Sequence, residues 1–261
     1  MTGYLLAFVI GISLGLLGGG GSILTVPTLA YVMNVEPKAA IAMSLPIVGL
    51  TSLSGALRHW RAGRIDLRTA LGFGAVAMIG SYSAARGARL IPGVVQLTLL
   101  GVVMLVAAAL MLRPRASDSS AGATPRPVLL GAAGLGVGVL TGLVGIGGGF
   151  LFVPALVLLG GVPMKNAVGT SLIVIALNTA AGAVAYRGQV PMDWTLVLAF
   201  TACAIVGSLV GARLVDRVST EGLKRGFALF LIVMAGFVLW TNRAVLMNPG
   251  AALHPGAAQT R

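Results

Sequence analysis

Long apolar runs alternate with short polar connections over most of the chain, and this alternation is its main pattern. Most of the runs approach the 20 or so apolar residues that a helix needs to cross a bilayer. No stretch of about 10 residues alternates between apolar and polar positions, as a membrane barrel strand would. The pattern predicts an all-α polytopic membrane protein with about eight hydrophobic segments, near 4–33, 39–57, 67–85, 93–112, 128–160, 166–186, 194–212 and 223–241.

A glycine cluster interrupts the first run, and a second cluster interrupts the fifth. The first is Gly18-Gly19-Gly20-Gly21, followed by Ser22, and the second is Gly145-Ile146-Gly147-Gly148-Gly149, followed by Phe150. Glycine disfavours a helix interior because it loses the most backbone entropy on ordering, so each cluster predicts a break. In hydrocarbon a break persists only where protein or a water-filled cavity surrounds it. Paired breaks in two halves of a membrane protein indicate a substrate site.

The two halves of the chain repeat each other at a constant offset of 127 residues. The matched pairs include Pro27 with Pro154, Ser44 with Ser171, Gly55 with Gly182, Gly80 with Gly207, and Arg86 with Arg213. We infer a duplication, with repeats at 1–112 and 128–241. The segment 113–127 is rich in proline, serine and glycine and is expected to be a flexible linker, and the tail 242–261 is expected to be disordered.

Two membrane arrangements stay open. If each half crosses four times, the halves are parallel and the lysines and arginines divide 10 to 8 between the two sides. If each broken run is a re-entrant hairpin, each half crosses three times, the second half is inverted, and the division is 12 to 6. The positive-inside bias favours the second arrangement. A straight helix of 30 residues would also be about 45 Å long, against a hydrocarbon core of about 30 Å.

The helix that follows each break is a candidate anion site. The first backbone N–H groups of a helix have no intrahelical partner, and the helix dipole places partial positive charge there. The candidate residues are Gly20, Gly21 and Ser22 in the first half, and Gly147, Gly148 and Gly149 in the second. The alternative is that the glycines only allow close helix packing, which is our interpretation of the separate pairs Gly11/Gly15, Gly134/Gly138 and Gly207/Gly211.

Polar side chains in the run after each break form a second candidate set. They are Ser44 and Thr51 in the first half, and Thr170, Ser171 and Asn178 in the second. Helical spacing brings Ser171 and Asn178 toward one face. Hydroxyl and amide groups there would donate hydrogen bonds to an anion without burying a charge, or would only bond neighbouring helices.

Ionisable and aromatic groups at the ends of the runs are candidates for a vestibule or for ion coupling. Lys38 and Lys165 stand at helix starts, and Asp66 and Asp193 are most simply N-caps. His59 falls in a basic segment that is expected to be a loop, where the second half has Tyr186. No Asp, Glu or Lys lies deep inside an expected span, so proton coupling has no carboxylate carrier there.

Composition excludes several other classes. Charged residues make up 9% of the chain, against about 25% in soluble domains. The net charge of +12 resides in the short connections, so it indicates membrane orientation and no nucleic-acid partner. Cys203 is the only cysteine, so neither a disulfide nor a thiolate metal site is expected. Hydrolase, metalloprotease and nucleotide-binding motifs are not found, so we expect neither an enzyme nor a cofactor. We also expect no cleaved signal peptide.

At these residues the chain resembles the sulfite exporter TauE/SafE family, also called the 4-toluene sulfonate uptake permease family. The matching motifs are the glycine-rich segments that end in Val-Pro at 18–27 and 145–154, and the segment 165–171 with Asn178 and Tyr186. The first half departs from the fuller motif, because Ala42-Met43-Ser44 stands where the second half has Gly-Thr-Ser. The second half is therefore expected to hold more of the ligand contacts.

The resemblance implies a multi-pass permease of the bacterial plasma (inner) membrane for sulfite, sulfoacetate or a related organosulfur anion. We expect a secondary transporter, with a passive anion channel or a non-transporting membrane scaffold as the alternatives. Its expected partners are the lipid bilayer and a small sulfur anion. Proton or sodium is the candidate coupling ion, and a homo-oligomer is a candidate assembly. The anion, the direction of transport and the coupling ion stay open.

Overall fold

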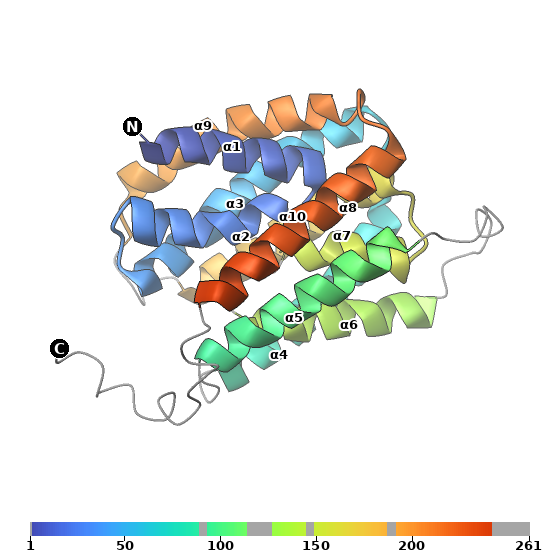
Figure 1. Cartoon of the computed structure of the whole chain (residues 1–261), viewed down its shortest axis with the longest axis horizontal. Helices are drawn as coiled ribbons and strands as arrows, with labels where there is room; N and C mark the ends of the chain where they lie inside the picture. Colours follow the sequence, from blue (N-terminus) through green and yellow to red (C-terminus); the bar gives the residue numbers. More distant parts are fainter. Residues whose placement is uncertain (1, 89–92, 114–126, 145–148, 187–191, 242–261) are drawn as a thin grey trace.

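The computed structural model describes residues 2–88, 93–113, 127–144, 149–186 and 192–241, and these form helices joined by short connections (Figure 1). The described part of each expected apolar run is mainly helical, and no strand occurs within these ranges. In chain order the elements are α1 (Thr2–Leu17), α2 (Gly20–Pro27), the π-helical turn η1 (Thr28–Val32), α3 (Pro37–Arg61), α4 (Leu67–Ala88), α5 (Gly93–Leu112), α6 (Pro127–Val144), α7 (Gly149–Leu158), α8 (Met164–Tyr186), α9 (Trp194–Leu214) and α10 (Thr220–Thr241).

The first apolar run is a hairpin. After α1 the chain reverses at Gly18, and α2 with η1 returns alongside α1 (Figure 1). The side chain of Met33 lies against Gly3, and the carbonyl of Ile10 lies against Gly21, so residues near both ends of the run are brought together. A single long helix over 4–33 is therefore excluded, because the glycine cluster turns the backbone instead of bending it.

Two glycine seams join helices that are far apart in sequence. Gly11 and Gly15 of α1 face Ala204 and Ser208 of α9 in the same order, so these two helices run parallel. A Cβ on Gly15 would lie 2.8 Å from the Ser208 carbonyl carbon. The packing interpretation of these glycine pairs is confirmed, since only a residue without a side chain allows this approach.

The second seam joins α4 to α6. A Cβ on Gly138 would lie 2.8 Å from Ala77 Cα, and one on Gly80 would lie 2.7 Å from the Leu135 oxygen. One turn earlier on both helices Gly134 faces Phe73, so α4 and α6 also run parallel. Each seam thus pairs the first helix of one expected half with a helix of the other half.

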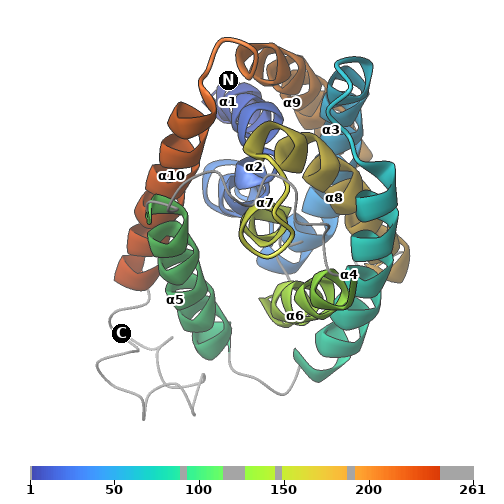
Figure 2. The same ribbon diagram turned by 90° about the vertical axis from the view of Figure 1, so that its right-hand side faces the viewer.

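The centre of the molecule holds α2 and α7, and the other helices surround them (Figure 2). Beside them α3 and α8 cross in opposite directions, with Gly182 against Leu45 and Gly55 against Leu172. Phe152 of α7 is fully buried and meets Phe73 of α4 edge to face, with ring centroids 5.9 Å apart. Short broken helices therefore occupy the core, and long helices shield them.

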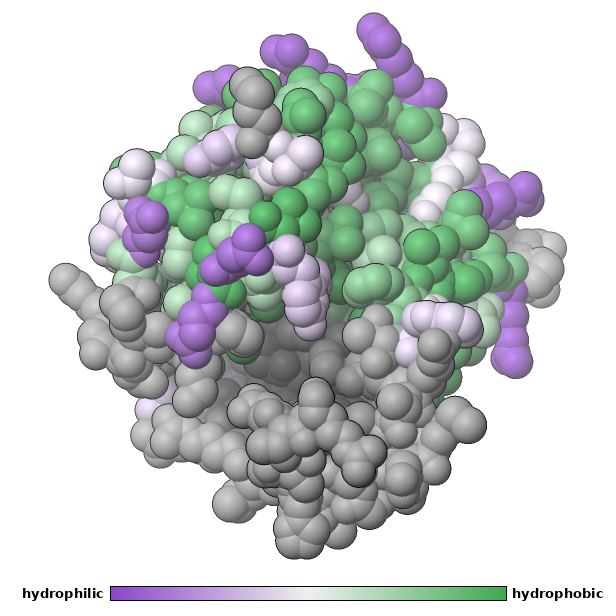
Figure 3. All heavy atoms as spheres, turned by 60° about the vertical axis from the view of Figure 1, so that its left-hand side comes forward, coloured by the Kyte–Doolittle hydropathy of each residue, from purple (hydrophilic) through white to green (hydrophobic). Residues whose placement is uncertain are grey.

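Large apolar side chains cover the outside. Leu198 on α9 and Leu229 on α10 are each 62% exposed. Figure 3 shows apolar residues over most of the coloured part of this face and hydrophilic residues mainly along the edges of that part. Within the described ranges four helices, α3, α8, α9 and α10, are long and apolar enough to cross a membrane, and several apolar helices are shorter. The protein is a multi-pass membrane protein.

Candidate functional site

The two breaks meet at the centre of the helix assembly. A Cβ on Gly19 would lie 2.8 Å from the Gly149 carbonyl carbon and 2.9 Å from Phe150 Cα. The hydroxyl oxygen of Ser22 is 3.3 Å from the place that a Cβ on Gly149 would take. All four residues are buried. The starts of α2 and α7 are thus in direct backbone contact.

Gly18 makes the turn of the first break and binds α8. Its φ of +72° lies in the left-handed region that glycine adopts without strain. Its carbonyl oxygen accepts a 2.6 Å hydrogen bond from Ser171 Oγ. A Cβ on Gly18 would lie 2.7 Å from that same hydroxyl. Both the dihedral angle and the contact with α8 therefore require glycine here.

Of the other predicted glycines, two contact neighbouring helices and two lie outside the described residues. Gly20 faces Phe230 of α10, and Gly21 faces α1, so neither points toward Gly149. Gly147 and Gly148 lie outside the described residues. The sequence predicted that these helices begin at Ser22 and Phe150, but they begin earlier, at Gly20 and Gly149. Of the predicted glycines that the structure describes, Gly149 alone lies at the contact between the two breaks, and its partner there, Gly19, was not among the predicted residues.

Three of the predicted hydroxyl groups bond within their own helix or turn. Ser22 donates to the Gly19 oxygen at 2.8 Å, Ser44 to Ile41 at 2.7 Å, and Thr51 to Ile47 at 2.6 Å. Such local bonds leave the hydroxyl oxygen free to reorient toward a ligand at small cost. Ser171 differs because its hydroxyl reaches another helix break.

On α8 the predicted polar residues lie along the inner side of the bundle. Thr170 and Ser171 are fully buried, and Asn178 is 7% exposed. Thr170 Oγ1 accepts a 3.1 Å hydrogen bond from the backbone N–H of Asp66. The structure thus ties Thr170 to the α3–α4 connection and Ser171 to the first break.

Asp66 and Asp193 cap helices, as predicted. The Asp66 carboxylate accepts from the backbone N–H of Thr69, and that of Asp193 accepts from Leu196, each at 3.1 Å. Burial raises the pKa of Asp66, but the hydrogen bonds from Thr69, together with the backbone N–H and the charge of Arg68, leave the pKa below its ordinary value. Both carboxylates are exposed at helix ends.

The two lysines and Tyr186 add little to the described site. Lys165 is half-buried in the first turn of α8. Lys38 lies in the first turn of α3 and Tyr186 at the end of α8, and their side chains lie outside the described part of the structure. Their proposed vestibule role stays a prediction.

The α3–α4 connection contacts both α8 and the segment that follows α9. Arg64, in this connection, forms an ion pair with Asp216, which follows α9, and Arg58 lies 3.8 Å from the same carboxylate. The Arg64 guanidinium donates to the Asp216 carboxylate and holds its pKa below the ordinary value. The Arg64 carbonyl also lies against Gly169. The connection therefore closes over α8 and α9 at one end of the molecule.

His59 lies inside the bundle, and its expected place in a loop was wrong. Helix α3 extends to Arg61, because the basic residues near its end suit the negative end of the helix dipole. The side chain is 1% exposed, and Nε2 is 3.2 Å from the Gly15 oxygen of α1. Its other ring nitrogen, Nδ1, is buried without a hydrogen-bond partner within the described structure.

Two further buried serines extend this polar surface, and Ser208 was not among the predicted residues. Ser208 of α9 donates to the Thr51 carbonyl at 3.3 Å, and Ser52 Oγ is buried without a partner in the described ranges. Ser52 precedes His59 by seven residues on α3, so both lie on one helix face. The i, i+7 spacing of Ser52 and His59 was the sequence feature that could have indicated a shared polar face on this helix.

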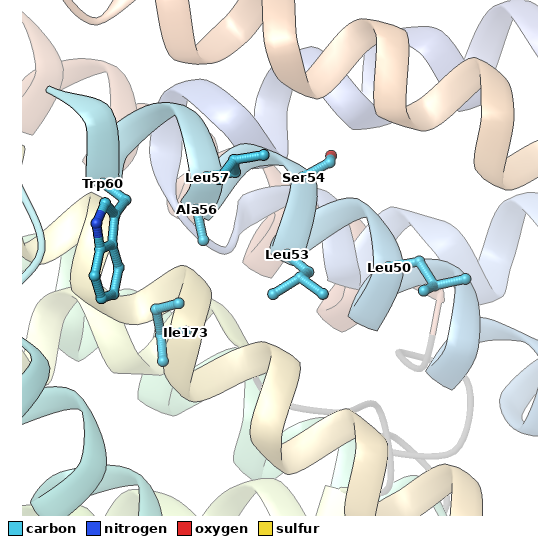
Figure 4. A pocket seen from close by; sticks show the side chains of 7 residues that line it. All are labelled: Leu50, Leu53, Ser54, Ala56, Leu57, Trp60 and Ile173. Carbon is cyan, nitrogen blue, oxygen red and sulfur yellow. The ribbon is translucent and has the colours of Figure 1, made fainter.

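A separate groove runs along the outer side of α3. It has a volume of about 540 Å³ and is lined by Leu50, Leu53, Ser54, Ala56, Leu57, Trp60 and Ile173 (Figure 4). Its lining is almost entirely apolar, and Leu53 and Leu57 are each 54% exposed. Since no lining group carries charge, the groove suits hydrocarbon and does not suit a small anion. No cluster of metal-ligating side chains occurs among the described residues.

The comparisons with known proteins agree with this architecture. The family model described as "Sulfite exporter TauE/SafE" matches residues 4–238, which is nearly the whole chain. The chain belongs to the TauE/SafE family. This family assignment confirms the resemblance that the glycine and Lys165–Ser171 motifs indicated.

Relatives of this TauE/SafE protein include bacterial and archaeal membrane transporters. A "Probable membrane transporter protein" of Xylella fastidiosa is 34% identical over 246 residues, covering 92% of this chain and 94% of the relative. Corresponding proteins of Bacillus subtilis and Methanocaldococcus jannaschii are 29% and 26% identical. The alignments cover 90% of this chain in both cases, and 98% and 93% of the relatives. The alignments thus span nearly all of this chain and of these probable membrane transporter proteins.

Proposed function

We propose that this TauE/SafE protein is a secondary transporter for a small sulfur oxyanion or organosulfonate, such as sulfite or sulfoacetate. The observation that carries the proposal is the contact of Gly19 with Gly149, which brings the starts of α2 and α7 together. The first backbone N–H groups of a helix have no partner in the preceding turn, and the positive end of the helix dipole lies there. Two such ends in a protein interior suit a small anion.

The anion would bind between the breaks after they separate. In the described conformation Gly19 and Gly149 are in van der Waals contact, and Ser171 holds Gly18 against α8. Substrate entry therefore requires α2 and α7 to move apart, and the hydroxyls of Ser22 and Ser171 would then turn from backbone carbonyls to the anion. Such a cycle is alternating access at a central site.

We also propose that the halves are inverted repeats with re-entrant first hairpins. The reversal of the chain at Gly18 supports this arrangement in the first half. The two parallel seams support it further, because exchanging the halves converts the α1–α9 pair into the α6–α4 pair. In this arrangement the α3–α4 connection and Asp216 lie on the side with more lysine and arginine.

Flux through proteoliposomes tests the proposal. Sulfite, sulfoacetate, taurine and thiosulfate are each offered with and without a pH gradient, and counterflow is measured. Saturable flux with counterflow of one sulfur anion is expected. Flux that rises linearly with concentration would show a channel, and no flux of any anion would favour a scaffold.

Two variants test the site. Gly19→Leu would wedge the breaks apart and Asn178→Leu would remove the buried amide, so both are expected to abolish flux while the protein still inserts. Gly236→Leu is the matched control, because nothing lies within 4 Å of a Cβ on that α10 residue. Normal flux in both site variants would remove the site assignment and leave the family assignment intact.

A further inference from the structure

The His59 side chain has a chemical feature that packing alone does not explain. Of the side chains that the structure describes as buried, His59 is the one that ionises near neutral pH. One ring nitrogen approaches α1 and the other has no partner. A buried polar atom without a partner costs about 1 to 3 kcal/mol, so a functional reason is required.

The hydrogen bond fixes which nitrogen exchanges a proton. A backbone carbonyl can only accept, so the contact with the Gly15 oxygen requires the hydrogen to be on Nε2. In the neutral ring Nδ1 is then an unpaired acceptor. A proton that arrives there converts it to an N–H donor, and the ring becomes a cation.

His59 also lies close to the first break. Gly15 precedes Gly18 by three residues, which is about 4.5 Å of helix rise. On the other side, a Cβ on Gly169 would lie 3.0 Å from His59 Cβ, and Gly169 is two residues from Ser171. The His59 side chain therefore lies beside both segments that the Ser171–Gly18 hydrogen bond joins, with its ring toward α1 and its Cβ toward α8.

Charged groups of both signs surround His59. Its own helix contributes Arg58, the connection contributes Arg64, and the segment after α9 contributes Asp216. Helix α8 contributes Lys165, which acts on Asp216. The described part of α1 has no charged side chain. Two guanidinium groups and one carboxylate therefore act on His59, and an anion at the break would add a second negative charge.

We propose that His59 is the proton-binding site of this transporter, and that it takes up a proton at Nδ1 together with the anion. This inference rests on the proposed transport of an anion. Because binding linkage is reciprocal, the anion increases the protonated fraction of His59, and protonation tightens anion binding by the same factor. The proton and the anion then cross in the same direction.

Nitrogen NMR of histidine-labelled protein tests the proton site without altering it. The chain has two histidines, His59 and His254, so His254→Gln leaves one pair of ring signals. Above pH 7 we expect the tautomer with hydrogen on Nε2, and titration of Nδ1 between pH 4 and 8. A signal that does not titrate in this range, or the opposite tautomer, would overturn the proposal.

Anion linkage and flux complete the test. With saturating transported anion the titration midpoint is expected to rise by about one pH unit, a coupling of about tenfold. In proteoliposomes His59→Gln should lose gradient-driven accumulation, and its counterflow should need about tenfold more anion, while His254→Gln keeps both as in the wild type. Two results would refute the proton site and leave the transport function standing. One is saturable wild-type flux that does not depend on the pH gradient, and the other is gradient-driven accumulation that persists in His59→Gln. The absence of saturable flux would refute both.

Discussion

The hydroxyl of Ser171 donates a 2.6 Å hydrogen bond to the carbonyl oxygen of Gly18, across 153 residues of sequence. It joins the second-half motif to the break of the first half. The same hydroxyl is 2.8 Å from the Val168 oxygen within α8, so its one hydrogen has two acceptors available. A small movement of the break can therefore transfer the Ser171 hydrogen bond from the Gly18 oxygen to the Val168 oxygen.

Removing this hydroxyl is expected to lower stability. Ser171→Ala should cost about 1 kcal/mol, because the Gly18 carbonyl is then left without its partner. Ser44→Ala is the matched control, since Ser44 bonds only within α3 and the change should be near zero. Thermal unfolding in mild detergent measures both. Equal midpoints for the two variants would contradict the interhelical role of Ser171.

Gly18 is expected to tolerate no side chain. Gly18→Ala adds left-handed strain and an overlap with Ser171, for a total cost of about 2 to 5 kcal/mol. Gly63 has a similar φ of +67° with nothing within 4 Å, so Gly63→Ala carries the strain alone, about 1 to 2 kcal/mol. The difference between the two unfolding free energies isolates the contact. A difference near zero would show that the break repacks freely.

The seam between α1 and α9 is expected to need glycine. Gly207→Ala places a methyl group against the Phe8 carbonyl and must separate the helices, which should cost at least about 1 kcal/mol. Gly236→Ala is a helical glycine in open space and should gain up to about 1 kcal/mol from helix propensity. Unfolding midpoints that move in opposite directions are the expected result, and two parallel shifts would argue against the seam.

The Arg64–Asp216 pair predicts a specific pH dependence. The folded pKa of Asp216 is lowered by Arg64, so the pair stabilises fully above the unfolded value of 3.8 and is lost as pH falls from there through the folded value. Asp216→Asn should therefore be less stable than the wild type from pH 8 to 5, by no more than about 1 kcal/mol because the pair is partly exposed. The difference should shrink below pH 4. A difference that grows with acidity would show the opposite sign of coupling.

Membrane orientation of the first hairpin is open to a direct test. In a Cys203→Ser background, Thr2→Cys and Asn34→Cys should react with an impermeant thiol reagent from the same side, because the chain reverses at Gly18. Ala62→Cys should react from the opposite side, since α3 lies between. Labelling of Thr2→Cys and Asn34→Cys from opposite sides would contradict the re-entrant hairpin.

The sequence predicted the helices well, because the length and hydropathy of each run reflect a local requirement. It also predicted the reversal at the glycine cluster as one of two arrangements, and the close packing at Gly11 and Gly207. The place of His59 was missed, because a helix end rich in arginine looks like a loop until its neighbours are known. The pairing of α1 with α9 could not be predicted, since a small-residue face does not specify its distant partner.

The α1–α9 seam has a consequence for the order of synthesis. Gly11 and its neighbour Ala204 are separated by 193 residues, so α1 enters the membrane well before its packing partner exists. At about 5 to 20 residues per second, the ribosome needs roughly 10 to 40 s to supply α9. During that interval the glycine face of α1 must be occupied by lipid or by the insertion machinery. Neither half expressed alone can complete its own bundle, and two separate fragments would assemble only when they are made together.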